Sequence, residues 1–434
     1  MGLPHATALV AGTIIGAAIF VQPSEISRHV PSAWGTLLVW LLSGALTLCG
    51  ALVCAELASA FPRTGGVYVF LRESFSPAAG FLWGWAMFWS MHSGIIAAIA
   101  VVFGRYVGYF VPLGGAGIRV VAAAGILILS AVNYAGVRQG SNLQALLTLV
   151  KVIAVVILIV LLFALGPPAR GPGLAPASPQ VTVGGLVLAL SAGLFAFGGW
   201  HMVTYTAEET RHPERTIPRA LLIGTLAVTA CYLALNLGYL RALPVEQLTE
   251  SSRVAADAAQ AVAGPRAAAT VSALVVVSSF GALSGIVLAG PRVYLAMAQD
   301  GLMFRWAGAI HPVRATPHRA ILLQALWSCV LVATDTYRGL FTRVIYTEWI
   351  FFALMAAGMM RLRRRAGYSP ACRAWGYPVT PLLFIAGSLV IVGQQVAANP
   401  LGCAAGLLLV AAGLPVYAWW ARPGARKGAA GAGH

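Results

Sequence analysis

The sequence predicts an all-α polytopic membrane protein with twelve membrane-spanning helices. Two observations lead to this fold class. Hydrophobic residues make up 59% of the 434 residues and charged residues only 9%, and the mean hydropathy is +0.83. The hydrophobic residues also collect in runs of roughly 20, the length that an α-helix needs to cross the hydrocarbon of a bilayer. A chain of this composition has lipid as its main solvent.

Twelve such runs follow one another along the chain. Turn residues separate them, and the last two are divided at Asn399 and Pro400 in "AANPLG". The predicted spans are 4–27, 34–61, 78–111, 118–137, 142–165, 183–206, 218–240, 266–297, 318–335, 340–360, 379–397 and 401–420.

The loops indicate an orientation. Those on the side of the N-terminus hold about twice as many Lys and Arg residues as those on the opposite side, so the positive-inside rule predicts cytoplasmic termini in a multi-pass protein of the cell (cytoplasmic) membrane. The net charge of +16 is explained by these loops, and binding to nucleic acid is not predicted. The six cysteines fall mainly in apolar segments, which argues against a disulfide framework, and a cleaved signal peptide is not expected.

Glycine interrupts two spans at corresponding positions. The first span contains "GTIIGAAIF" (12–20), and the sixth contains "FAFGGWHM" (195–202). The third and eighth spans are both unusually long. This correspondence predicts a five-plus-five inverted repeat (1–165 and 183–360), two extra helices (379–420) and a cytoplasmic tail (421–434), all in one transmembrane domain, 1–434. Matching interruptions point to a substrate site, whereas the alternative is that glycine only lets the helices pack closely.

Six motifs, in order along nearly the whole chain, resemble the amino acid–polyamine–organocation (APC) family of permeases. They are "GTIIGAAIF", "AELASAFPRTGGVY" (55–68), "NYAGVRQGSNLQALLTLVK" (133–151), "FAFGGWHMVTYTAEETRHPERTIPRA" (195–220), "GPRVYLAMAQDGL" (290–302) and "RAWGYPVTPLL" (373–383). "FGGW" and "EWIFF" (348–352) look most like the L-type amino acid transporter (LAT) branch and its bacterial relatives. The resemblance implies a LeuT-like fold with discontinuous helices 1 and 6, alternating access, and a substrate that carries an α-amino and an α-carboxyl group.

The family pattern also implies a substrate site at the two breaks. The amides of Ala17 and Ala18, after Gly16, would hold the carboxylate, because the start of a half-helix presents unpaired N–H groups. The ammonium group would be held by the carbonyl groups of Ile14, Phe195 and Gly198, with Gly199 completing the second break. Ala18 stands where the family usually has glycine, which favours a small substrate unless the methyl group is without consequence.

Lys151 is the most informative ionisable residue. It lies about nine residues into the fifth span, roughly 13 Å deep. In sodium-coupled relatives of this architecture a sodium ion bridges the first and eighth helices, and the resemblance implies that the ammonium group of a matching lysine takes its place. We therefore expect Lys151 to bond to the first span and to a serine of the eighth, which would make transport sodium-independent. The candidate serines are Ser278, Ser279 and Ser284. The alternative is a lysine that snorkels to the interface.

Other side chains are candidates for gating. The resemblance makes Phe195 an aromatic lid, while Trp200 is either part of a gate or packing. His201 and His92 are expected to form hydrogen-bonded helix contacts, although His201 could contact the substrate or sense protons. Glu208 and Arg63 are expected in an ion-pair network at the inner gate, with a solvated loop as the equal alternative.

Two buried carboxylates remain. Glu56 is expected to pair with a loop arginine or with backbone, and Glu348 lies in the tenth span. We expect no carboxylate beside either break.

These observations predict a permease that moves small neutral L-amino acids by sodium-independent exchange. The alternatives are a proton-coupled carrier of cationic amino acids or polyamines, which would need a carboxylate in the pocket, and an amino acid sensor. An enzyme is not predicted, since the spans contain no HExxH pair, nucleophile motif or metal-ligand cluster, and no cofactor or metal is expected. The loop "VPLGGAGIR" (111–119) lacks the cysteine through which animal members of the branch join a heavy subunit, so no covalent partner is expected.

Overall fold

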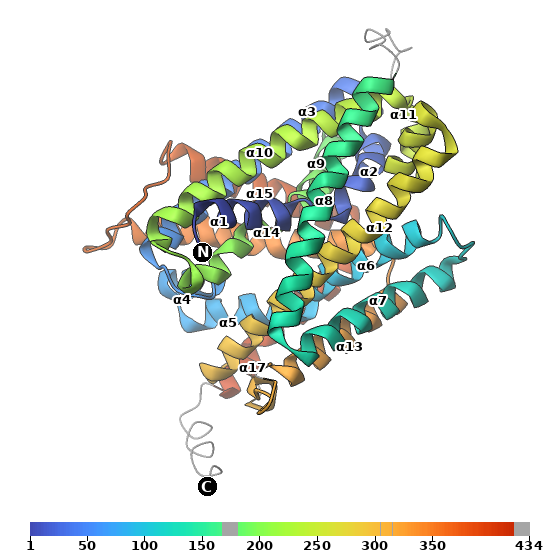
Figure 1. Ribbon diagram of the computed structural model, residues 1–434. Coiled ribbons are helices and arrows are strands. Elements are labelled where there is room, and N and C mark those ends of the chain that lie inside the picture. Colours follow the sequence, from blue (N-terminus) through green and yellow to red (C-terminus); the bar gives the residue numbers. More distant parts are fainter. Residues whose placement is uncertain (167–180, 304, 315, 421–434) are drawn as a thin grey trace.

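The computed structural model of the chain is an α-helical bundle (Figure 1). It describes residues 1–166, 181–303, 305–314 and 316–420, and within these it does not describe the side chains of 137–149, 296, 299, 305 and 307. The described part of the chain contains no β-strand, so the all-α prediction is confirmed. The predicted tail, 421–434, lies outside the described residues.

The first half of the chain forms α1 (Leu3–Ile14), η1 (Ala17–Phe20), α2 (Gln22–His29), α3 (Ala33–Ala60), α4 (Val67–Ser74), α5 (Pro77–Ala86), η2 (Met87–Met91), α6 (His92–Val107), α7 (Gly115–Ala135) and α8 (Val137–Leu165). The second half forms α9 (Val183–Ala196), η3 (Trp200–Glu209), α10 (Pro213–Ala242), α11 (Val245–Glu250), α12 (Val254–Gln299), η4 (Arg305–Gly308), α13 (His318–Thr334) and α14 (Tyr337–Leu362). Three further helices end the described chain: α15 (Val379–Ala398), α16 (Pro400–Ala411) and α17 (Gly413–Trp420).

Each predicted span coincides with one helix or with one row of consecutive helices. Nine helices of the described residues are long and apolar enough to cross a membrane by length and composition. Three shorter apolar helices, Leu3–Ile14, Val150–Leu165 and His318–Thr334, fall on the predicted first, fifth and ninth spans. The number of twelve crossings and the orientation stay predictions.

The first span is discontinuous. Helix α1 ends at Ile14, Gly16 is extended (φ −104°, ψ −169°), and η1 begins at Ala17. Because a helix end leaves its terminal backbone groups without partners inside the helix, the break exposes carbonyl groups of α1 and N–H groups of η1 at the same point.

The sixth span is discontinuous as well. Helix α9 ends at Ala196 and η3 begins at Trp200. Between them Gly199 adopts a left-handed backbone conformation (φ +93°, ψ −6°) that favours glycine. A methyl group at Gly199 would lie 3.0 Å from the carbonyl oxygen of Thr13 in α1. The backbone of the second break at Gly199 therefore lies directly against the end of α1 at Thr13.

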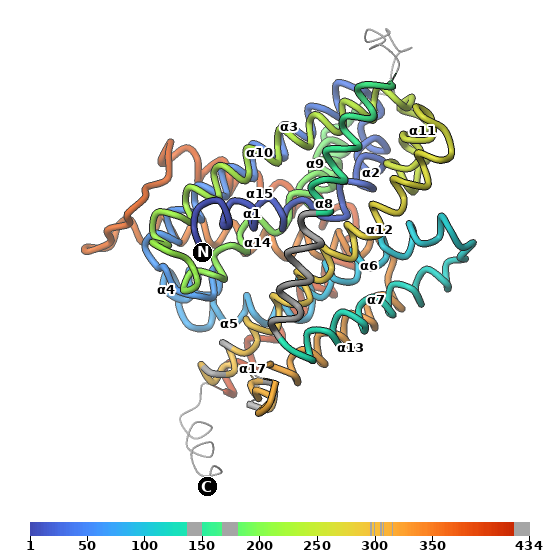
Figure 2. The backbone as a smooth tube through the Cα atoms, viewed as in Figure 1, coloured from blue at the N-terminus to red at the C-terminus, as the bar shows by residue number. Residues whose placement is uncertain are grey.

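The third and eighth spans are long, as predicted. Helices α5, η2 and α6 form one row of 31 residues, Pro77–Val107. Helix α12 has 46 residues and is interrupted at Gly264 (φ +78°). It packs along α8 and α6, so the eighth and fifth spans, from different halves of the chain, are neighbours (Figure 2).

The final helices lie at the periphery. Helix α15 packs against α14 and α3. Leu401 and Leu408 of α16 are 85% and 70% exposed, which suits a surface that faces lipid. The breaks of the first and sixth spans instead lie among buried residues at the centre of the bundle.

Candidate functional site

A small cavity lies between the two helix breaks. Its volume is about 30 Å³, roughly the share of liquid volume that one water molecule occupies. The first span lines it with Thr13, Ile14, Gly16 and Ala18, and the sixth with Phe195, Ala196, Gly198, Gly199 and Met202. Ile95 and Ile99 of α6, Ile286 of α12, and Val344 and Glu348 of α14 complete the wall. The substrate-binding residues predicted from the sequence all line this cavity except Ala17, which is fully buried beside it.

Tyr232 of α10 links the two breaks through hydrogen bonds. Its hydroxyl lies 2.9 Å from the carbonyl oxygen of Ile14 and 3.1 Å from that of Ala196, and it donates to this pair. The carbonyl oxygen of Phe195 accepts a hydrogen bond from the Gly198 amide at 3.1 Å. A carbonyl oxygen has two lone pairs, so Ile14 and Phe195 keep acceptor capacity for a ligand. Tyr232 was missed in the sequence analysis, because its span position does not reveal which face of α10 meets the breaks.

Lys151 of α8 is fully buried, and its ammonium group donates a hydrogen bond to the carbonyl oxygen of Gly12. Gly12 lies in the last turn of α1, where carbonyl groups have no partner inside the helix. The expected contact with the first span is therefore present, and a side chain with no exposed surface does not snorkel to an interface.

The expected contact of Lys151 with a serine of the eighth span is not found among the described residues. Among the described residues, no hydrogen bond joins Lys151 to Ser278, Ser279 or Ser284. The Ser279 hydroxyl donates to carbonyl oxygens of its own helix, at 2.7 Å to Val275 and 3.1 Å to Val276, and Ser278 Oγ has no partner among the described atoms. The physical reason is that a short hydroxyl side chain inside a helix readily bonds back to the preceding turn.

The structure corrects the expectation that no carboxylate lies beside either break. Glu348 lines the cavity and is 4% exposed. His201 Nε2 lies 3.9 Å from Glu348 Oε1. The position of Glu348 along its span gave its depth in the membrane but not the face of the helix on which it lies. The other buried histidine, His92, makes the expected helix contact, 2.8 Å from the carbonyl oxygen of Ile286.

The aromatic candidates separate into two roles. Phe195 lines the cavity, and its ring packs on Phe341 and Tyr337 of α14, with centroid distances of 5.6 and 6.5 Å. Trp200 does not line the cavity and packs on Phe352 and His201, at 5.1 and 5.5 Å. Phe195 is therefore part of the cavity wall and Trp200 part of the packing outside it, and the role of Phe195 as a lid stays a prediction.

An ion pair lies at the end of the bundle where α14 begins. Arg338 of α14 donates to Glu25 Oε2 from Nη2 at 2.7 Å and from Nε at 3.0 Å. Two cavities of about 600 and 560 Å³ share both residues in their walls. The pair thus ties α2 to α14 in the wall that the two cavities share.

The opposite end is closed by a different set of contacts from the one predicted. Glu208 reaches the "FPRTGGVY" loop, but it accepts a hydrogen bond from the backbone amide of Thr64 at 3.3 Å rather than from Arg63, for which the described residues show no ion pair. Tyr68 of α4 instead donates to Asp300 Oδ2 at 2.5 Å, and Arg72 lies 3.2 Å from the same oxygen. Burial and the Asp300 carboxylate raise the pKa of Tyr68, so its hydroxyl stays protonated and donates.

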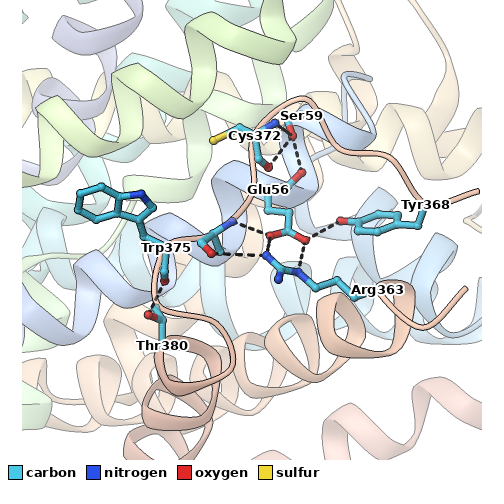
Figure 3. Close-up of polar contacts among 8 residues, drawn as sticks. Glu56, Ser59, Arg363, Tyr368, Cys372, Trp375 and Thr380 are labelled. Atoms are coloured by element: carbon cyan, nitrogen blue, oxygen red, sulfur yellow. Dashed lines mark hydrogen bonds and ion pairs between the residues drawn. The ribbon is translucent and has the colours of Figure 1, made fainter.

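Glu56 forms the contacts expected of it. Its carboxylate accepts two hydrogen bonds from Arg363, one of them at 2.8 Å from Nε, and another from the backbone amide of Ala374 at 2.6 Å (Figure 3). The Tyr368 hydroxyl donates to it at 3.3 Å. The hydrogen bond to Glu56 raises the pKa of Arg363. The network fixes the segment between α14 and α15 to the end of α3.

The comparisons with known proteins agree with this geometry. A family model described as amino acid permease matches residues 1–413. The serine/threonine exchanger SteT of Bacillus subtilis (strain 168) is 32% identical over 421 residues, which cover 96% of this chain and 95% of that protein. The large neutral amino acids transporter small subunit 2 of Rattus norvegicus is 30% identical over 434 residues, which cover 96% and 80% of the two chains.

The human b(0,+)-type amino acid transporter 1 is also 30% identical, over 370 residues that cover 84% of this chain and 76% of that protein. These relatives are named as transporters or exchangers and not as enzymes. A multi-pass helical chain that is discontinuous at the first and sixth spans, with this match over residues 1–413, belongs to the amino acid permease family.

Proposed function

We propose that the chain moves free L-amino acids across the cell membrane by alternating access, with the substrate held in the cavity between the two helix breaks. The observation that carries the proposal is that both breaks open into the same buried cavity at the centre of the bundle. Residues 1–165 and 183–360 act as two inverted five-helix repeats, with 379–420 outside them and both termini in the cytoplasm.

The backbone groups at the breaks replace the hydration shell of the substrate. The N–H groups at the start of η1, at Ala17 and Ala18, carry the positive end of a helix dipole and bind the α-carboxylate. The carbonyl groups of Ile14, Phe195 and Gly198 bind the α-ammonium group. Gly199 supplies the left-handed backbone conformation of the second break, and Gly16 is extended at the first.

The carrier exchanges small neutral amino acids without sodium. Lys151 supports sodium independence, because its ammonium group already occupies the end of α1. The printed name of SteT, a serine/threonine exchanger, supports exchange and a small substrate. The methyl group of Ala18 in the cavity wall also favours a small substrate.

The protein works without a covalently attached subunit. Some relatives are named as the small subunit of a transporter of large neutral amino acids. The loop that joins α6 to α7, residues 108–114, contains no cysteine that could join such a subunit.

One observation favours a second candidate function. Because Glu348 lines the cavity, the pocket holds the carboxylate that a proton-coupled carrier of cationic amino acids or polyamines would need. Against it stand the apolar side chains of Ile95, Ile99 and Ile286 around that carboxyl group. A non-transporting sensor would use the same cavity without turnover.

Counterflow in proteoliposomes separates these functions. Purified protein is reconstituted into vesicles loaded with unlabelled alanine, and uptake of labelled alanine is measured in sodium-containing and choline-containing buffers. We expect trans-stimulated uptake in both buffers and no stimulation by a pH gradient alone. A sensor would show a thermal shift with amino acids but no uptake, and uptake driven only by a pH gradient would support the proton-coupled carrier.

A further inference from the structure

Glu348 is the side chain of the cavity that is free to recognise a substrate. Among the lining residues that the structure describes, only Thr13 and Glu348 have polar side chains. The Thr13 hydroxyl is already used, since it donates to the carbonyl oxygens of Leu9 and Val10 at 2.9 Å each. The backbone groups of the breaks serve the α-amino and α-carboxyl groups, which all amino acids share. Selectivity for a side chain must therefore come from Glu348 and the apolar wall.

The carboxyl group of Glu348 lacks a hydrogen-bond partner in the described part of the chain. His201 Nε2, at 3.9 Å, is beyond hydrogen-bond distance. The neighbouring hydroxyl group of Thr347 is paired with Ser90 at 3.1 Å, on a different face of α14 from the cavity. Burying a polar group without a partner is unfavourable. A ligand that donates one hydrogen bond at this point would remove that penalty.

The surroundings of Glu348 restrict the kind of donor. Val344 precedes it by one turn of α14, and Ile95, Ile99 and Ile286 face the cavity from α6 and α12. These branched side chains surround the carboxyl group with apolar wall and offer no second polar partner to the charged end of a lysine or arginine side chain. A hydroxyl group on a short side chain fits the acceptor.

We propose that Glu348 accepts a hydrogen bond from the side-chain hydroxyl of the substrate, so that the carrier selects serine and threonine over alanine and valine. The inference rests on the proposed function, because it places the substrate in the cavity between the breaks. Threonine and valine have nearly the same shape and differ by a hydroxyl in place of a methyl group. Their comparison therefore separates hydrogen bonding from size.

The test measures competition against labelled alanine counterflow in proteoliposomes. For the wild-type protein, we expect threonine to compete at a concentration at least about tenfold lower than valine, the ratio that one hydrogen bond worth about 1.4 kcal/mol provides. Serine should compete better than alanine by a similar ratio. Glu348→Met should reduce both ratios to about one, and Glu348→Gln, whose amide oxygen still accepts, should keep most of the preference.

The control is Thr347→Val, which removes a buried hydroxyl from the adjacent position of α14 outside the cavity. It should leave both ratios as in the wild type. The wild-type ratio remains decisive if Glu348→Met fails to fold in a thermal unfolding assay.

Three results would overturn the inference. Wild-type protein that exchanges alanine but does not distinguish threonine from valine would refute it and leave the proposed function intact. So would an unchanged ratio in folded Glu348→Met, or competition by lysine or ornithine that Glu348→Gln abolishes. If the wild-type protein exchanges no amino acid at all, the proposed function itself fails and the inference falls with it.

Discussion

Lys151 in α8 donates a hydrogen bond to the carbonyl oxygen of Gly12, in the last turn of α1. The two residues come from different spans, and the contact is fully buried. It places a positive charge at the carbonyl end of a half-helix, where the macrodipole favours a cation. The contact therefore stabilises the break in the first span without a dissolved ion.

Substitution of Lys151 should abolish most of the exchange. Lys151→Ala leaves a buried carbonyl group without its partner, a loss of about 1–3 kcal/mol that should lower the initial rate of alanine counterflow about tenfold or more. Lys151→Arg keeps the charge and should retain more activity than Lys151→Ala. The assay is repeated with and without sodium. Wild-type activity that depends on sodium, or full activity of Lys151→Ala, would contradict the role assigned to this residue.

Substitution of Gly199 should destabilise the protein. Gly199→Ala forces a side chain into a left-handed backbone conformation and brings its methyl group to 3.0 Å from the carbonyl oxygen of Thr13. We expect a loss of about 1–3 kcal/mol and a lower midpoint of thermal unfolding in detergent. Gly393→Ala is the matched control, since an added methyl group there meets no atom within 4 Å. Equal midpoints for the two variants would show that the contact between the breaks is not tight.

Charge reversal at Glu25 and Arg338 tests whether their ion pair helps to close the cavity between the two helix breaks at this end of the bundle. Glu25→Arg and Arg338→Glu each place like charges opposite one another and should slow counterflow, because the closed state is disfavoured. The double variant Glu25→Arg/Arg338→Glu restores opposite charges and should recover part of the rate. Raised ionic strength should affect the single variants most. If the loss of counterflow rate in the double variant, expressed as a free energy, equals the sum of the losses in the two single variants, the two residues do not act as a pair.

Substitution of Glu56 should affect stability more than substrate selection. Glu56→Gln removes the charge that Arg363 and the Ala374 amide contact, which should cost about 3–5 kcal/mol and lower the midpoint of thermal unfolding. The amino acids that compete in counterflow should stay the same, because Glu56 does not line the cavity. Glu73→Gln, whose carboxylate is 35% exposed and pairs with Arg72, is the control and should change the midpoint little.

The residues that the sequence identified best are those whose effect is local. Gly199 acts on its own backbone, and the glycines at matching positions of the first and sixth spans were enough to predict both breaks. The depth of Lys151 in the fifth span marked it as an intramembrane cation, and the resemblance to the permease family implied its contact with the first span.

The contacts that sequence analysis missed depend on which faces of distant helices meet. Glu348 and Tyr232 reach the breaks only because α14 and α10 turn those faces inward. Tyr68 and Asp300 are 232 positions apart, so neither motif predicts the other. The sequence of a hydrophobic span with little amphipathic pattern predicts how deep each residue lies in the membrane. It does not predict which face of the helix points toward the neighbouring helices.

The ammonium group at the end of α1 differs from a bound ion in one respect, which is that it cannot leave. An ion that dissociates at each turn of a transport cycle passes the free energy of its own gradient to the substrate. A charge fixed to the polypeptide returns at the end of the cycle to where it began, and its net work is zero. A carrier built in this way exchanges amino acids until each of them has the same ratio of inside to outside concentration. The direction of net flow of one amino acid is then set by which one the cell consumes.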